Sequence, residues 1–128
     1  MPAQPRTTAV QLRLAHFLGR VVREGGAWSV VHQGEPIVIH VPREDVLPLW
    51  SSEVAARAAQ RRGWPQLATG ELSLCTLVHE LLPSSQEHRI SIGICGSTRS
   101  EEIITIPADW LERALRAGIE TGWRTALD

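Results

Sequence analysis

One junction, residues 46–59, constrains the fold of this chain more than any other stretch. It begins with apolar residues interrupted by one proline, which indicates a buried strand. Ser51 or Ser52 can cap a helix that follows at once, and Glu53 suits its first turn, where the helix dipole favours a negative charge. Gly63 fits a left-handed position at the end of that helix. The junction therefore predicts a strand that runs directly into a helix.

The residues before the junction predict a helix and a β-hairpin. Apolar side chains recur at helical spacing over residues 7–24, which is typical of an amphipathic helix. Residues 27–32 alternate as a strand does, and Gln33-Gly34 supplies a tight turn. Residues 35–41 are the partner strand in this prediction.

The residues after the junction predict a helix flanked by strands. Residues 66–71 are interpreted as a short strand. Ser73 can cap a helix that Pro83 ends, because proline disfavours helical backbone at the residue before it, and residues 83–87 then form a polar loop.

The last part of the chain predicts a second hairpin and a final helix. Residues 89–95 alternate strictly between isoleucine and small or polar residues, which is typical of a half-buried strand. After a five-residue loop, residues 101–106 are expected to pair back antiparallel. A helix from Pro107 then ends at Gly118.

Together these elements predict an α+β domain. We expect a mostly antiparallel sheet of about five strands with four helices, the first and last helix lying on one face. At 128 residues the chain is long enough for one domain with its own core, so residues 1–128 are expected to form a single domain. Residues 1–6 and 119–128 are expected to be frayed tails.

Charge is balanced overall but not along the chain. The formal net charge is −1, so no global field directs the chain toward nucleic acid or a membrane. Residues 1–64 carry 8 arginines against 5 acids, whereas residues 65–128 carry 5 against 9. A bipolar surface of this kind favours self-association, although ordinary surface variation can also produce it.

Composition bounds the source and the cellular compartment. The chain has no lysine, asparagine or tyrosine, residues whose codons are AT-rich, which indicates a GC-rich bacterial genome. The two cysteines, Cys75 and Cys95, lack the spacing of a disulfide framework or a zinc site. We therefore expect a bacterial cytoplasmic protein, without a membrane-spanning segment or a cofactor.

Three motifs resemble a known family. They are Gly25-Gly26-Ala27-Trp28, the junction Leu47–Ala55 and the helix Pro107–Leu115. The chain resembles, from about Val10 to Leu115, the bacterial domain-of-unknown-function family numbered twenty-seven fifty. Family members often carry Trp-Pro at the junction, where this chain has Trp50-Ser51. The junction is also similar to that of the serine-sensitivity-enhancer family. The resemblance implies no established activity.

Cys95 and Arg99 are the only candidates for an enzyme site. A thiolate, a loop of backbone N–H groups and an arginine can hold a phosphate. Cysteine phosphatases place five residues between the two side chains, however, and their loop opens a helix. Here three residues intervene and a strand follows, so the alternative is a hairpin loop with a buried thiol.

The histidines do not predict a metal site. His79-Glu80 lacks the second histidine of a zinc-protease helix, because residue 83 is proline. His32 and His40 are expected near opposite ends of neighbouring strands. We therefore expect neither a metal nor a recognisable small-molecule ligand.

Arginines on the first helix are a candidate for nucleic-acid binding. Arg6, Arg13, Arg20 and Arg23 precede any acid in the chain and could contact phosphates. No aromatic residue lies among them, and Glu24 follows Arg20 at helical spacing. A solvated helix face is the favoured interpretation.

Tryptophan is abundant for a chain of this length. Trp28, Trp50 and Trp110 fit predicted core faces, whereas Trp64 and Trp123 do not. Because exposed tryptophan often anchors interfaces, these two could mark a partner surface.

We therefore interpret the chain as a non-enzymatic protein-binding module. An adaptor, a regulatory domain or an immunity-type protein that neutralises a toxin would fit, and the candidate interaction surface comprises Trp64, Trp123 and Arg99. A homodimer is plausible because hairpin-built sheets leave edges that need covering. The alternatives are a small enzyme using Cys95 and Arg99 and weak nucleic-acid binding through the first helix.

Overall fold

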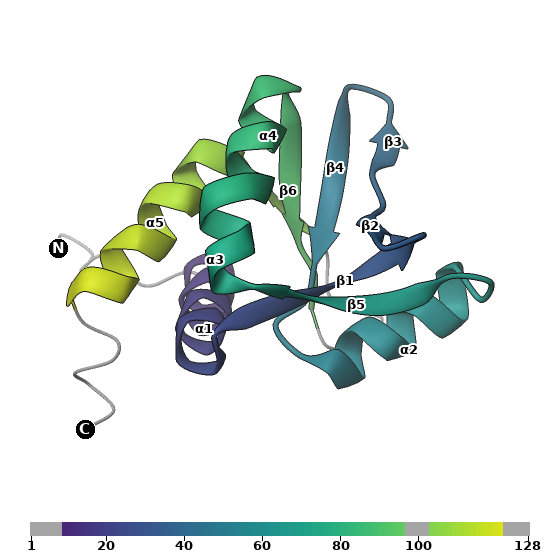
Figure 1. The fold of residues 1–128 in the computed structure, drawn as a ribbon, viewed down its shortest axis with the longest axis horizontal. Coiled ribbons are helices and arrows are strands. Elements are labelled where there is room, and N and C mark those ends of the chain that lie inside the picture. Colours follow the sequence, from purple (N-terminus) through teal and green to yellow (C-terminus); the bar gives the residue numbers. More distant parts are fainter. Residues whose placement is uncertain (1–8, 97–102, 122–128) are drawn as a thin grey trace, which may run out of the picture.

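A computed structural model describes residues 9–96 and 103–121 of the chain. The described residues form a single compact α+β domain of alternating helices and short strands (Figure 1). In chain order, the elements are α1 (Ala9–Glu24), β1 (Gly26–His32), β2 (Glu35–Pro36), β3 (Ile39–Val41), β4 (Glu44–Leu49), α2 (Glu53–Gly63), β5 (Ala68–Ser73), α3 (Leu74–Thr76), the π-helical segment η1 (Leu77–Leu81), α4 (Leu82–Glu87), β6 (Ile90–Ile94), β7 (Ile104–Ile106) and α5 (Ala108–Thr121).

The strands belong to two sheets, which cross in Figure 1. One sheet has the order β2-β1-β5 and the other the order β3-β4-β6-β7. Every pair of neighbouring strands is antiparallel except β4 and β6, which run parallel. The predicted α+β class, mostly antiparallel and with four continuous helical segments, is confirmed. Its strands are divided between two sheets where the sequence had suggested one sheet.

The predicted strand over residues 35–41 is divided because the chain changes sheets inside it. Gln33 and Gly34 both have positive φ, at 53° and 82°, which suits the tight turn of a twisted hairpin. Only two residue pairs join β1 and β2 after this turn. The chain then crosses to the other sheet, where β3 pairs with β4.

A backbone bridge between Trp28 and Trp50 joins the two sheets. Each residue donates its N–H to the carbonyl of the other, at 2.8 Å in both directions. Beside this bridge, the buried hydroxyl of Ser29 donates to the carbonyl of Pro48 at 2.7 Å. The end of β4 is therefore held from β1 as well as from β6.

Pro48 is tolerated in a central strand because its missing N–H would face away from β6. A residue in a strand directs its N–H and its carbonyl to the same side. The Pro48 carbonyl accepts from Ser29, so the N–H side of Pro48 also faces β1. β3 does not reach Pro48, because its pairing with β4 stops at Ile39, opposite Val46. Leu49, one residue later, turns its carbonyl the other way and accepts from the Cys95 N–H at 2.9 Å.

Two apolar clusters form the core. The larger one lies among α1, α5, the helix of residues 74–87 and the sheet of β4 and β6, and includes the fully buried Leu49, Leu111 and Leu115. The smaller one joins β1 to α2 through Val30, Trp50 and Ala56. α1 and α5 also contact each other.

The helix predicted to end at Pro83 continues through it, and the predicted loop at residues 83–87 is α4. A proline in an α-helix lacks the N–H for the ladder and its ring clashes with the carbonyl four residues earlier. The helix widens just before that point: the Leu82 N–H bonds to the carbonyl of Leu77, five residues back, within η1. Leu82 and Ser85 are both buried, so continuing the helix keeps them in the core.

Gly118 does not end α5, contrary to the prediction, because the helix continues to Thr121. Gly118 is itself buried, and Ile119 packs against the larger cluster.

Trp110 was also wrongly assigned to the core: its side chain is 38% exposed. The buried face of α5 passes through Ala108, Leu111 and Leu115, which leaves position 110 on the flank.

The remaining element predictions are confirmed with shifted bounds. The strand expected at residues 66–71 is β5, and it pairs with β1 over six residue pairs. The last predicted hairpin is present as β6 and β7, although residues 101 and 102 lie outside the described part. No helix in the described part is both long enough and apolar enough to span a bilayer.

We predict that Gly26→Ala destabilises the fold. A Cβ at position 26 would lie 2.6 Å from the backbone carbonyl oxygen of Leu72, so β1 and β5 would have to separate. We expect the free energy of unfolding in urea to fall by about 1–3 kcal/mol. The control is Gly19→Ala in α1, where a Cβ meets nothing within 4 Å and should raise that free energy by up to about 1 kcal/mol. Equal effects of the two substitutions would contradict the close approach at Gly26.

Candidate functional site

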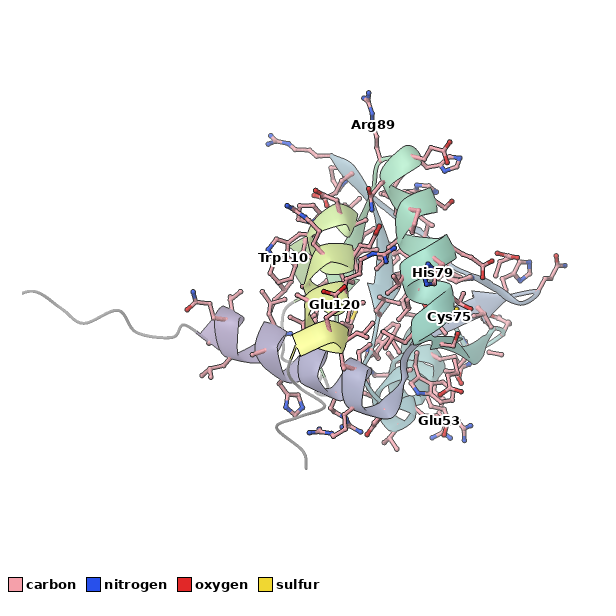
Figure 2. The ribbon with its side chains drawn as sticks, turned by 60° about the vertical axis from the view of Figure 1, so that its left-hand side comes forward. Glu53, Cys75, His79, Arg89, Trp110 and Glu120 are labelled. Atoms are coloured by element: carbon pink, nitrogen blue, oxygen red, sulfur yellow. The ribbon has the colours of Figure 1, made fainter. Side chains whose placement is uncertain are left out.

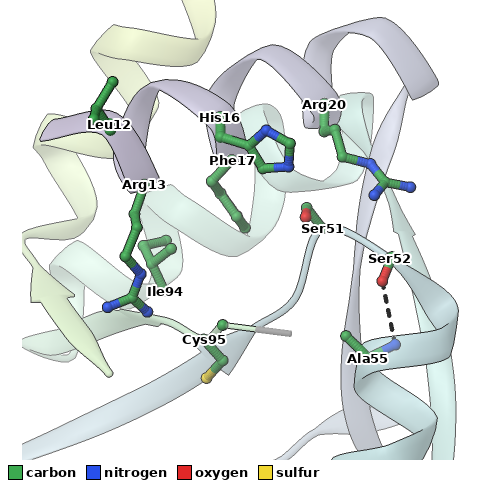
Figure 3. Close-up of a pocket in the computed structure, with 11 residues that line it drawn as sticks. Leu12, Arg13, His16, Phe17, Arg20, Ser51, Ser52, Ala55, Ile94 and Cys95 are labelled. Atoms are coloured by element: carbon green, nitrogen blue, oxygen red, sulfur yellow. Dashed lines mark hydrogen bonds between the residues drawn. The ribbon is translucent and has the colours of Figure 1, made fainter. Parts of the chain in front are cut away.

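A pocket lies where α1 passes over the start of α2 and the carboxyl ends of β4 and β6 (Figure 3). Its volume is about 270 Å³. Its lining comprises Leu12, Arg13, His16, Phe17, Arg20, Ser51, Ser52, Ala55, Ile94, Cys95 and Gly96. In α/β sheets, ligands bind in the crevice outside the carboxyl ends of parallel strands, and β4 and β6 supply one such pair here.

One face of α1 supplies the basic side of the pocket. Arg13, His16 and Arg20 are spaced by three and four residues, which places them in one row along the helix. Phe17, beside this row, is buried and anchors α1 to the core. In Figure 3 the three polar side chains lie along the pocket side of α1. Arg20 also donates to Glu24 at 3.1 Å, at the far end of the row.

The connection from β4 to α2 supplies the opposite wall. Ser52 caps α2 as predicted: its hydroxyl accepts from the Ala55 N–H at 3.2 Å. Ser51, half-buried, precedes it in the pocket lining. Glu53, in the first turn of α2, is exposed and accepts from Arg57 at 2.8 Å. The N-terminus of α2 is therefore capped by its own chain.

Cys95 forms part of the pocket floor, and its thiol is poorly suited to nucleophilic chemistry. Burial raises its pKa from the ordinary value of 9.0 to about 12, while a backbone bond with Leu49 and the charge of Arg13 act in the opposite direction. The sulfur donates to the Gly93 carbonyl at 3.6 Å. The predicted alternative of a buried thiol therefore fits the structure better than the predicted phosphatase-like nucleophile.

The pocket is basic, and apolar side chains lie exposed beside it. No lining residue in the described part of the chain is acidic, whereas two are arginines. Leu12, on the rim, is 59% exposed, and Val54, in the first turn of α2, is 80% exposed.

Of the interaction surface that the sequence suggested, only Trp64 lies in the described part of the chain. Trp64 is half-buried and packs against the smaller cluster. The side chain of Gln60 holds this region by donating to the carbonyls of Trp64 and Leu67, at 3.0 and 2.9 Å. Arg99 and Trp123 lie outside the described residues. So does Arg6, one of the four arginines considered for nucleic-acid binding.

A second groove, of about 280 Å³, lies between the helix of residues 74–87 and α5. Figure 2 shows Cys75 and His79 on the first of these helices and Glu120 on the second. Arg116, also in the groove, is paired with Glu112 at 3.0 Å. Across residues 9–96 and 103–121, no three His, Cys, Asp or Glu side chains are placed to hold a metal ion together.

Sequence reasoning missed the pocket because its walls are far apart in the chain. The signal on α1 was visible: Arg13 and Arg20 are two turns apart, with His16 between them and Phe17 adjacent. The arginines were interpreted as a solvated face because no aromatic residue lies among them and Glu24 follows Arg20 at helical spacing, and nothing in the sequence places α1 over the start of α2.

Fold and pocket together define a small α+β domain with a basic pocket. The family model of proteins of unknown function designated DUF2750 matches residues 14–115, and the chain belongs to this family. The resemblance noted from the sequence is thereby confirmed. Among curated proteins, no sequence matches this chain.

We predict that Cys95 resists alkylation at pH 8 while Cys75 reacts. Each unit of pKa changes the thiolate fraction by a factor of about ten. With a pKa of about 12, Cys95 therefore has a thiolate fraction about 1000-fold lower than that of a cysteine with the ordinary pKa of 9.0. Cys75 is exposed. Iodoacetamide should therefore add one label to the native protein and two to the urea-unfolded protein, as read by peptide mass spectrometry. Labelling of Cys95 at the rate of Cys75 would contradict a desolvated thiol.

Proposed function

We propose that this domain is a non-enzymatic protein-binding module, acting as an adaptor or a regulatory domain. The observation that carries the proposal is the basic pocket beside exposed Leu12 and Val54. This combination would allow a partner to bury apolar side chains while its acidic groups face Arg13 and Arg20. We name this surface, made by α1 and the first turn of α2, the α1–α2 face.

The state of Cys95 supports a binding role over catalysis. Burial raises the pKa of Cys95, the nucleophile of the enzyme alternative, and so keeps its thiol protonated. The hydroxyl of Ser52 accepts the Ala55 N–H and caps α2. Binding needs only the arrangement of apolar and basic groups that the α1–α2 face offers. Both cysteines are free thiols, which supports the cytoplasmic location expected from the sequence.

The nucleic-acid alternative has less support than protein binding. Glu24 is paired with Arg20, and Arg13 lines the pocket together with apolar residues. A surface that tracks a phosphate backbone needs cations spread along a groove, whereas Arg13 and Arg20 line one small cavity.

Site-specific photo-crosslinking in cells tests the proposal. A photoreactive phenylalanine at position 54, on the α1–α2 face, should yield one dominant crosslinked protein. The matched control is position 41, where Val41 in β3 is also exposed but far along the chain from the pocket. We expect the position 54 product to decrease at least tenfold when Leu12→Glu is added.

Three outcomes would overturn the proposal. They are no product from position 54, equal products from both positions, and a product that nuclease removes. A product with the mass of two copies of this chain would identify the partner as a second copy and the module as a homodimer.

A further inference from the structure

We infer that the pocket between α1 and α2 binds an oxyanion, the carboxylate or phosphate group of its ligand, through Arg20 and Ser51, with the charge of Arg13 at the other end of the pocket. The inference deepens the proposed function by naming the chemical group that the α1–α2 face recognises, and it rests on that function for the partner that carries the group.

The size of the pocket fits one functional group. Pockets for whole drug-sized ligands and cofactors have about 300–1,000 Å³ and bury most of the ligand. This pocket has about 270 Å³ and opens at the surface. It can therefore enclose the charged end of a larger molecule while the remainder lies over Leu12 and Val54.

Charge selects an anion over a neutral or cationic group. Two guanidinium groups line the pocket from α1, two turns apart and so about 10 Å along the helix axis, and Figure 3 shows them at opposite ends of it. Guanidinium groups bind carboxylate and phosphate oxygens with pairs of parallel hydrogen bonds. The guanidinium group of Arg20 donates one N–H to Glu24 at 3.1 Å. It carries further N–H donors that this bond does not use.

The remaining walls strengthen this attraction. Phe17, Ile94 and Ala55 are buried and apolar, and they keep water away from one side of the cavity. An ionic hydrogen bond is stronger in such surroundings than in bulk water. The Cys95 thiol stays neutral, so it does not repel an anion.

The hydroxyl of Ser51, which lines the pocket, can donate to an anion. The hydroxyl of Ser52 accepts the Ala55 N–H and caps α2 in doing so, which keeps its oxygen directed at the helix terminus. The N-terminus of α2 therefore adds little to the site, and the inference does not depend on it. The binding groups come from the side chains of α1 and from Ser51.

Anion titration followed by NMR tests the inference on the purified chain. Sodium phosphate and, separately, sodium acetate are added to ¹⁵N-labelled protein, with sodium chloride at equal ionic strength as the control. We expect saturable shifts of the amide signals of residues 13–20, 51, 52 and 95 with phosphate or acetate and not with chloride. A tighter dissociation constant for phosphate identifies a phosphate ligand, and equal constants identify a carboxylate.

Three variants locate the binding. Arg20→Gln should weaken the anion about tenfold, the loss expected for one ionic hydrogen bond. Arg61→Gln, which removes an exposed arginine from the last turn of α2, should leave the dissociation constant unchanged. Glu24→Gln should tighten binding two- to threefold because it removes the carboxylate that competes for Arg20. A merely structural role of Arg20 would not produce this opposite effect.

The inference is overturned if chloride reproduces the shifts, or if Arg20→Gln and Arg61→Gln bind equally well. The two proposals can fail separately. Crosslinks from position 54 without anion binding would retain the protein-binding function and overturn the oxyanion site. Anion binding without a crosslinked partner would retain the site and overturn the protein-binding function.

Discussion

The structure depends on the paired backbone bonds between Trp28 and Trp50. This bridge fixes the end of β4 against β1 at the point where the two sheets cross. Trp50 is also buried in the smaller cluster, so the residue that makes the bridge packs α2 as well. Losing the bridge would leave two buried N–H and two buried carbonyl groups to be satisfied elsewhere, at a cost of about 1–3 kcal/mol for each group left unpaired.

The bridge also sets where α2 begins. Ser51 and Ser52 follow Trp50 directly, so the cap of α2 is held in place by the same hydrogen bonds that join the sheets. α1 then closes over this point because Phe17 and Val21 are buried in the larger cluster. The basic row on α1 consequently faces a wall whose position is fixed by β1 and β4.

Local patterns predicted most of the elements, and longer-range packing decided the rest. The alternation of isoleucines in β6, the cap at Ser52 and the turn at Gln33-Gly34 are short-range signals that the structure confirms. Pro83 was misleading because the π-helical segment before it is stabilised by the burial of Leu82, a tertiary effect. Gly118 was misleading for the same reason, since packing of Ile119 outweighs the low helix propensity of glycine. The pocket was missed because it exists only when residues 13–20, 51–52 and 94–96 meet.

The parallel pairing of β4 and β6 explains why those three segments meet. Antiparallel neighbours bring the end of one strand to the start of the next, so the loops that leave them lie at opposite edges. β4 and β6 run the same way, with Leu49 opposite Ile94, so the chain leaves both strands at one edge. One exit leads through Ser51 into α2 and the other through Cys95, and α1 covers both. A fold that is otherwise antiparallel over the described residues thus acquires an edge where two chain exits and a basic helix can form a pocket.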